Sequence, residues 1–286
     1  MKFAAATTLY DPKESFIDNL LNNAETFPLL LVYDNSSDNR AYVDRLREKE
    51  NIVYHWDGIN HGLPEVFNRA IDECWERGVD FLCTLDQDSV LGADTAARME
   101  AYLSGRDTSH IAAVGTCRGR QFTEDAGEDP AVDVDWLICS GCFLNLRVLK
   151  EHGITYDEAY FVDRFDEDLC RQLKKAGLRI RMLRNAYMAH SLGEGRKYSP
   201  LRNYYVFRNR FYFNKKHFGA FAALYRSTLQ TARHVLGLLR EGAAGREKLR
   251  SLPVAWRDYR RGRMGPITPA SLVAVTAHAK KDAGRA

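Results

Sequence analysis

Residues 80–89 read DFLCTLDQDS, and this stretch decides the fold class. Its first six residues are mostly apolar, and the run is short, as expected of a strand that is buried on both faces in a parallel sheet. The strand then stops at a polar turn made by Asp86, Gln87 and Asp88. Ligands of open α/β sheets bind at the carboxyl ends of the strands. The stretch therefore predicts an α/β protein with its chemistry at this strand end.

Strands and helices alternate on the N-terminal side of this stretch. Apolar runs predict strands at 3–9, 29–33 and 52–55, and Asp34 follows the second of them. One helix is expected to reach from Asp11 to about Phe27, with Asp11 as its N-cap and Pro12 in its first turn. Two more are expected, one ending near Lys49 and one over 62–78. This alternation predicts a Rossmann-like, mostly parallel sheet with helices on both faces. The glycine motifs of Rossmann dinucleotide sites and P-loops are absent.

The C-terminal half has a different pattern. We expect strands at 111–115, 132–138, 179–183 and 186–189, and helices at 166–176 and 200–217. The expected organisation is one α/β domain over 1–217, followed by a basic helical extension over 218–286. The extension is basic because residues 240–286 contain eleven Lys and Arg but only four Asp and Glu.

Composition limits the possible functions. The chain has 286 residues, of which 45% are hydrophobic and 28% charged, as in a globular protein with a sizeable core. The net charge of +3 is too small to indicate a nucleic-acid partner. The apolar start is too short for a signal peptide or a membrane span, so we expect a cytoplasmic protein. Cys139 and Cys142 have CxxC spacing without a second pair, which favours core cysteines over a zinc site.

Two acidic clusters are candidates for chemistry. Asp86 and Asp88 alternate on an extended segment, so one carboxylate can hold Mg²⁺ or Mn²⁺ while the other faces a ribose hydroxyl. The alternative is a solvated turn. Residues 163–168 place four acids before an amphipathic helix, where they stabilise the helix dipole or supply a general base. His190 ends a short apolar stretch and is either structural or a metal ligand.

Several short motifs follow one another along the chain. They are DNS (34–36), NHGL (60–63), NRA (68–70), LDQDS (85–89), SG (140–141), FVD (161–163) with Asp166, His190 with LG (192–193), SP (199–200), RNYY (202–205) and RN (208–209). Over about 200 residues the chain thereby resembles the family-2 glycosyltransferases of GT-A fold. The LDQDS form and the RNYY helix resemble the rhamnosyltransferases among them.

The resemblance implies a role for each matching residue. Asp88 and His190 would bind the metal, Mg²⁺ or Mn²⁺, and Asp34 would contact the base of the donor nucleotide. Asp166 would be the catalytic base; because Phe165 stands where the family has Glu, Asp163 and Asp168 are reserves. Arg202 and Arg208 would contact the diphosphate or the acceptor. The implied donor-binding residues are Thr8, Asp34, Asn60, Gly62, Asp86, Gln87, Ser140 and Gly141.

The implied reaction is an inverting transfer of L-rhamnose from dTDP-rhamnose to a saccharide or lipid-linked saccharide, in bacterial surface polysaccharide synthesis. One alternative is a family-2 transferase that uses a UDP-hexose or UDP-galactofuranose. Another is a catalytically silent subunit that binds a nucleotide or a glycan.

The C-terminal extension has a membrane-like pattern. Apolar residues over 218–239 fall on one helical face, and aromatic residues alternate with arginines over 256–264. An apolar face with clustered Arg and Trp or Tyr suits a helix lying in an anionic membrane surface. We therefore expect peripheral association with the inner face of the cytoplasmic membrane through 218–264. Packing on the chain's own domain or in a homodimer is the alternative.

Overall fold

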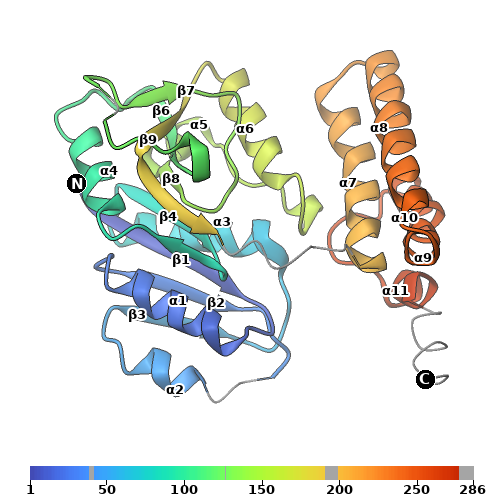
Figure 1. The fold of residues 1–286 in the computed structure, drawn as a ribbon, viewed down its shortest axis with the longest axis horizontal. Helices are drawn as coiled ribbons and strands as arrows, with labels where there is room; N and C mark the ends of the chain where they lie inside the picture. Colours follow the sequence, from blue (N-terminus) through green and yellow to red (C-terminus); the bar gives the residue numbers. More distant parts are fainter. Residues whose placement is uncertain (39–41, 126, 191–198, 277–286) are drawn as a thin grey trace. The chain divides into compact units, whose positions relative to one another are not determined.

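The computed structural model describes residues 1–38, 42–125, 127–190 and 199–276 (Figure 1). The chain divides into two compact units. The first, the sheet unit, consists of residues 1–157 and 166–193. The second, the helical unit, consists of residues 158–165 and 194–286. The short segment 158–165 therefore belongs to the helical unit although sheet-unit sequence flanks it on both sides.

The sheet unit contains one sheet of nine strands. Its first half is parallel and consists of β1 (Phe3–Leu9), β2 (Leu30–Asp34), β3 (Ile52–Trp56) and β4 (Phe81–Asp86). Its second half is mixed and consists of β5 (Ser89–Leu91), β6 (Ile111–Cys117), β7 (Ala131–Asp133), β8 (Cys142–Asn145) and β9 (Arg179–His190). The strand order is β3-β2-β1-β4-β8-β6-β9-β5, with β7 pairing β9.

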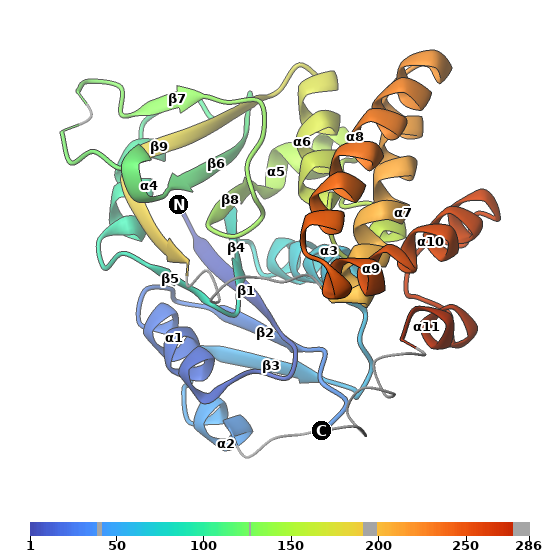
Figure 2. The same ribbon diagram turned by 45° about the vertical axis from the view of Figure 1, so that its right-hand side comes forward.

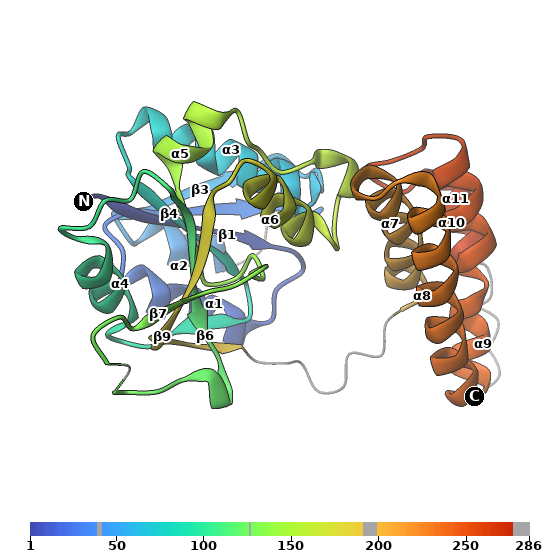
Figure 3. The ribbon, with the colours of Figure 1, turned by 90° about the horizontal axis from the view of Figure 1, so that it is seen from above.

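Helices cover both faces of this sheet (Figure 3). One face carries α1 (Glu14–Ala24), α2 (Tyr42–Arg47) and α4 (Thr95–Leu103), and the other carries α3 (Gly62–Glu76) and α5 (Leu146–His152). The last helix of the unit is α6 (Phe165–Lys175). All seven residues of β1 are buried, because both faces of the sheet are covered there.

The helical unit consists of α7 (Pro200–His217), α8 (Ala220–Arg240), α9 (Ala243–Leu249), α10 (Ser251–Arg260) and α11 (Pro269–Thr276), as Figure 2 shows. Ser199 caps α7 by accepting a hydrogen bond from the amide of Arg202, and Pro200 occupies its first turn. Aromatic residues of α7, including Tyr204 and Phe207, form a core with Leu238 and Val254. In the described part of the chain, none of the helices is both long and apolar enough to cross a membrane.

The fold class expected from the sequence is confirmed: a mostly parallel sheet has helices on both faces, and helices follow it. The packing places the boundary between the units earlier than the expected residue 217. α7 belongs with the helices that follow it, because its aromatic side chains are buried against them.

Several local predictions were wrong. Asp11 does not cap α1: Lys13 is the N-cap residue, while Asp11 has a positive φ of 41° and donates its amide hydrogen to Ser36 Oγ at 2.8 Å. The strand expected at 132–138 is only the three residues of β7. The two strands expected at 179–183 and 186–189 are the single strand β9, which pairs β5, β6 and β7. β5, β8, α4 and α5 were not predicted.

Candidate active site

The carboxyl ends of β1, β2 and β4 bring three of the predicted residues together. The register pairs Thr8 with Asp86 on one side, and Leu9 with Asp34 on the other. The hydroxyl oxygen of Thr8 is buried and has no hydrogen-bond partner in the described ranges. Buried polar atoms nearly always have a partner. This hydroxyl is therefore suited to a ligand at the strand ends.

Asp34 forms one wall of a pocket of about 330 Å³ at the end of β2. Its Oδ2 accepts hydrogen bonds from the hydroxyls of Tyr42 and Tyr54, each at 2.8 Å, and its Oδ1 accepts one from the amide of Ser36 at 2.9 Å. Burial and the contact with Asp34 raise the pKa of Tyr54, so this hydroxyl stays a donor. The other walls are Tyr33, Asn35, Tyr54, His55, Trp56, Asp57, His61, Val66 and Arg69. Aromatic walls with a fixed carboxylate are suited to a planar heterocycle.

Asn60 and Gly62 build the turn that opens α3 beside this pocket. Asn60 Oδ1 accepts from the amide of Gly62 at 2.9 Å. Asn35 holds the same turn from β2, since its Oδ1 accepts from the amide of His61 at 3.2 Å. Gly62 has a φ of 78°, a conformation that glycine adopts without strain. These contacts shape the turn of the NHGL motif, whose His61 lines the pocket.

Gln87 lies across the end of β1. Its Oε1 accepts from the amide of Tyr10 at 2.9 Å, and its Nε2 donates to the carbonyl of Tyr10 at 3.4 Å. The side chain of this residue thus joins the ends of β1 and β4.

Ser140 and Gly141 lie next to the turn formed by Asp86, Gln87 and Asp88. Ser140 Oγ accepts from the amide of Asp86 at 3.0 Å and lies 2.7 Å from Ser89 Oγ. Gly141 has a φ of 73°, and a Cβ at this position would lie 2.3 Å from Thr116 Oγ1 and 2.7 Å from Met188 Sδ. The Ser-Gly pair therefore supports the turn that carries Asp86 and Asp88, and no larger residue fits at its second position.

We expect Gly141→Ala to destabilise the protein clearly more than Gly153→Ala. Both glycines have positive φ, so both variants lose about 1–2 kcal/mol to the left-handed backbone. Only Gly141 is crowded, because nothing lies within 4 Å of a Cβ at Gly153. Overpacking adds about 1–3 kcal/mol, or roughly 2–4 °C in Tm per kcal/mol. Thermal denaturation of both variants measures the difference. Equal Tm values would show that Thr116 and Met188 accommodate the added Cβ without loss of stability.

Residues that follow β7 contact α6 of the same unit. Asp135 pairs with Lys174 of α6 at 3.5 Å, and the amide of Leu137 donates to Cys170 Sγ at 3.3 Å. These contacts hold residues 135–137 against α6, two residues before Cys139.

Cys139 is a buried residue beside Asp86. Its Sγ donates to Asp86 Oδ1 at 3.9 Å. Burial, followed by the charges of Asp86 and Asp166, holds the pKa of this thiol well above its usual range. The thiol thus stays protonated and unreactive. The charge of Asp86, which lies beside this buried thiol, and the charge of Asp166 in the first turn of α6 both act on it.

The three acids considered as a base have different surroundings. Asp166 is partly exposed in the first turn of α6, and its Oδ1 accepts from the amide of Glu167 at 2.9 Å. Asp163 is ion-paired with Arg202 at 2.6 Å. Asp168 is completely buried and accepts from Gln172 Nε2 at 2.8 Å. Of the three, Asp166 is partly exposed and its charge acts on the buried thiol beside Asp86.

The metal ligands implied by the resemblance lie in the turn between β4 and β5 and at the end of β9. Asp88, 7% exposed, follows β4, and the register pairs Ser89 of β5 with His190 at the end of β9. The side chain of His190 lies outside the described part of the structure. Within the described residues, no group of three or more His, Cys, Asp or Glu side chains is arranged to hold a metal. A cation that bridges diphosphate oxygens takes part of its coordination from the nucleotide, so the acidic oxygens of this turn suit Mg²⁺ or Mn²⁺.

Arg202 and Arg208 lie in the helical unit. Arg202 pairs with Asp163, as described above. Arg208 is completely buried: it donates to the carbonyl of Tyr160 at 3.3 Å and lies over the rings of Tyr204 and Tyr205. A contact from Arg208 to a diphosphate would require the side chain to leave this position.

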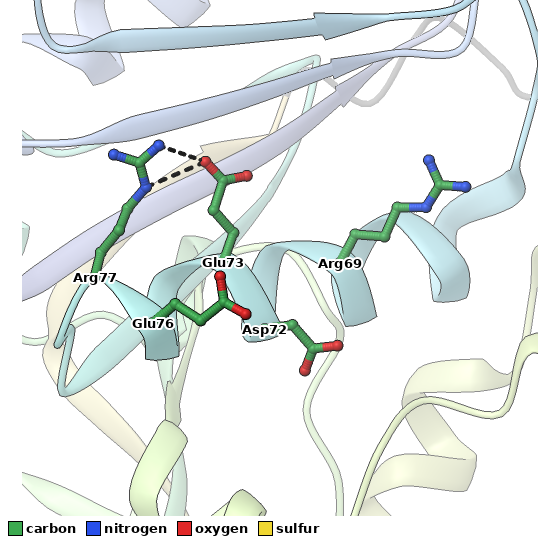
Figure 4. Close-up of a pocket in the computed structure, with 5 residues that line it drawn as sticks. All are labelled: Arg69, Asp72, Glu73, Glu76 and Arg77. Atoms are coloured by element: carbon green, nitrogen blue, oxygen red, sulfur yellow. Dashed lines mark hydrogen bonds and ion pairs between the residues drawn. The ribbon is translucent and has the colours of Figure 1, made fainter.

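A further hollow of about 620 Å³ lies along α3 (Figure 4). Its five lining residues are charged, and Arg77 donates two hydrogen bonds to Glu73 Oε1, at 2.7 and 3.1 Å. Four of these residues belong to α3, and Arg77 is its C-cap residue. We assign it no role in the site.

The sequence did not indicate Tyr42, Tyr54 or Cys139 as parts of the site. Tyr54 lies within a predicted strand, and its hydroxyl reaches Asp34 only through the pairing of β2 with β3. Cys139 had been interpreted as a core residue. It is buried as expected, but beside Asp86.

Comparisons with known proteins agree with this geometry. No family model matches the chain. A curated relative, dTDP-rhamnosyl transferase RfbF from Shigella flexneri, is 22% identical over 237 residues, which cover 74% of this chain and 79% of the relative. A 1–349 fragment of S. aureus TarS in complex with UDP aligns over 99% of this chain and 92% of its own, with a TM-score of 0.54 and 16% identity. This chain has the GT-A fold.

A second GT-A structure, GalNAc-T7 with UDP, GalNAc and Mn²⁺, has a TM-score of 0.54 at 8% identity. The match covers 66% of this chain but only 44% of GalNAc-T7. The resemblance to family-2 glycosyltransferases of the rhamnosyltransferase type is confirmed by RfbF and by the fold of these structures. The candidate active site of this GT-A protein lies at the carboxyl ends of β1, β2 and β4.

Proposed function

We propose that this GT-A protein is an inverting glycosyltransferase that moves a sugar from a nucleoside diphosphate to an acceptor hydroxyl. The observation that carries the proposal is the arrangement of acids within the sheet unit. Asp34 lies in a pocket at one strand end, Asp86 lies beside Cys139 at another, and the charge of Asp166 also acts on the Cys139 thiol. Such a site has one carboxylate for a nucleobase, one for the ribose and one for the acceptor proton.

In the proposed mechanism, the pocket at Asp34 binds the nucleobase, and Asp86 orients the ribose. Asp166 takes the proton from the acceptor hydroxyl, whose oxygen attacks the anomeric carbon opposite the leaving diphosphate. Asp163 and Asp168 are poorer candidates, because the first is ion-paired and the second is buried. A divalent cation, Mg²⁺ or Mn²⁺, held by Asp88 and His190 would neutralise charge on the diphosphate.

The proposed donor is dTDP-rhamnose, since the curated relative is named a dTDP-rhamnosyl transferase. A UDP-sugar is the second candidate, because a TarS fragment that matches 99% of this chain was crystallised with UDP-GlcNAc. The proposed acceptor is a saccharide, free or lipid-linked.

A donor screen tests the proposal. The purified chain is incubated with Mn²⁺ and one of dTDP-rhamnose, UDP-GlcNAc, UDP-glucose or UDP-galactofuranose, and mass spectrometry follows release of the nucleoside diphosphate. We expect dTDP-rhamnose to be consumed fastest. Preference for a UDP-sugar would select the second candidate. If the chain binds nucleotides and releases no product from any donor, it is a silent binding subunit.

We also propose that the helical unit binds an anionic membrane surface. Five large apolar side chains of α8 are exposed: Phe221, Leu224, Tyr225, Leu236 and Leu239. The most exposed of them is Phe221, at 85%. Part of the face expected from the sequence packs inward instead, since Val235 contacts the core of the unit. Arg260 and Arg261 are exposed at the end of α10. Apolar area and basic charge together support attachment to anionic lipid.

Liposome flotation should separate the two contributions. At about 1 kcal/mol per basic residue, Arg260→Gln with Arg261→Gln should weaken binding to anionic vesicles roughly 30-fold. Phe221→Ser with Leu224→Ser should weaken it at any salt concentration. These side chains are exposed, so the fold should persist. Absence of the wild type from the floated fraction, or equal flotation by all three proteins, would rule out this surface. Concentration-dependent sedimentation would then indicate a homodimer.

A further inference from the structure

The segment before Asp166 has an unusual backbone. Phe161, Asp163 and Arg164 have φ values of 63°, 62° and 66°, and none of them is glycine. Left-handed conformations are costly for residues with a Cβ and persist only where the surrounding structure enforces them. Three within four residues therefore require strong support from neighbouring groups.

That support comes from α7 of the same unit. Asn209 is completely buried, and its amide nitrogen donates to the carbonyls of Tyr160, Val162 and Asp163. Arg208 adds a second donor to the carbonyl of Tyr160 and also donates to Asn209 Oδ1 at 3.2 Å, which fixes the orientation of the Asn209 amide.

Two further contacts hold the same segment. Arg202 pairs with Asp163 at 2.6 Å, and the ring of Phe161 stacks on Tyr205 with a centroid distance of 5.3 Å. Residues of the RNYY and RN motifs thus hold residues 160–163 through hydrogen bonds, an ion pair and a ring contact.

We infer that Asn209, oriented by Arg208, is a positioning residue: it clamps the left-handed segment 160–164 and so fixes the backbone that leads into Asp166. The inference rests on the proposed function, in which Asp166 takes the acceptor proton. The segment joins α6 without an intervening residue, because Phe165 is the first residue of the helix. Release of the segment would let the first turn of α6 shift. A displacement of about 1 Å at a reacting group can cost about 100-fold in rate.

The test compares two buried asparagines of one helix. Asn214 is also completely buried in α7, but its amide donates to Ser227 and Gln230 of α8 and not to the segment. Hydrogen–deuterium exchange of the peptide 158–168 is measured for Asn209→Ala and Asn214→Ala, together with kcat and KM for the best donor of the screen. We expect Asn209→Ala to speed exchange in this peptide and to lower kcat about 10–100-fold with little change in donor KM. Asn214→Ala should affect neither.

A rescue separates clamping from general stability. In the Asn209→Ala background, Arg164→Gly should restore part of kcat, because glycine adopts positive φ without support. Arg164→Ala removes the same side chain and keeps the strain, so it should not. Equal loss of kcat in the Asn209 and Asn214 variants, or unchanged exchange in peptide 158–168, would overturn the inference.

Asp166→Asn, measured in parallel, separates this inference from the proposed base. If Asp166→Asn loses turnover and Asn209→Ala retains it, the clamp is refuted alone. If Asp166→Asn retains full turnover, the base assignment fails, and the catalytic part of the inference fails with it.

Discussion

Asp166→Asn should lower kcat by about 10²–10⁴-fold, the usual effect of removing a general base. The amide can still accept the hydrogen bond that the amide group of Glu167 donates, so the start of α6 should keep its conformation. Asn cannot take a proton from the acceptor hydroxyl. Nucleoside diphosphate affinity, measured by calorimetry, should change little, because Asp34 and its pocket lie at a different strand end.

Glu167→Gln is the matched control for this variant. Glu167 is the next residue, is also partly exposed and lies in the same acidic first turn. Its substitution removes the same charge from the helix N-terminus and should leave kcat within a few-fold of wild type. Similar losses in both variants would mean that the acids act through the helix dipole. A severe loss in Asp163→Asn, together with a mild one in Asp166→Asn, would move the base to Asp163.

Chelation should abolish turnover, and Asp88→Asn should reduce it by at least about 10²-fold. Loss of one group that stabilises developing charge typically costs about 10²–10³-fold. EDTA should remove activity that Mn²⁺ or Mg²⁺ restores in the wild type. In Asp88→Asn, Mn²⁺ should no longer raise nucleoside diphosphate affinity in calorimetry.

Asp94→Asn is the control for the loss of one carboxylate. Asp94 lies a few residues further on, exposed before α4, and pairs with Arg98 at 2.6 Å. The Asp94→Asn variant should keep wild-type turnover and the wild-type response to Mn²⁺. Full activity of the wild type in excess EDTA would remove the metal from the mechanism.

Much of the fold follows from local sequence. The strands of the parallel half were predicted within one or two residues, because each is a short apolar run closed by polar residues. Helix α7 was predicted at its observed ends, since Ser199 and Pro200 form a strong start signal. β8 and β5 were missed because strands of four and three residues carry no periodicity of their own. β8 pairs with β4 and β6, and β5 pairs with β9, so partners distant in sequence define both strands.

Which residues meet was decided by the tertiary structure. The acids of the candidate site are visible in the sequence as strand-end and helix-start residues. Their surroundings are not, because contacts across 50 or more residues leave no local pattern: Tyr10 with Gln87 and Cys139 with Asp86 are examples.

The same division holds for the RNYY and RN motifs. The sequence marks them as unusual but does not distinguish a ligand contact from a structural one. In the fold, Arg208 and Asn209 are completely buried and donate to the backbone carbonyls of 160–163. The sequence by itself determined the fold class and the candidate residues. Tertiary packing decided the partners of each residue, because burial and hydrogen bonding depend on chain segments that are distant in sequence.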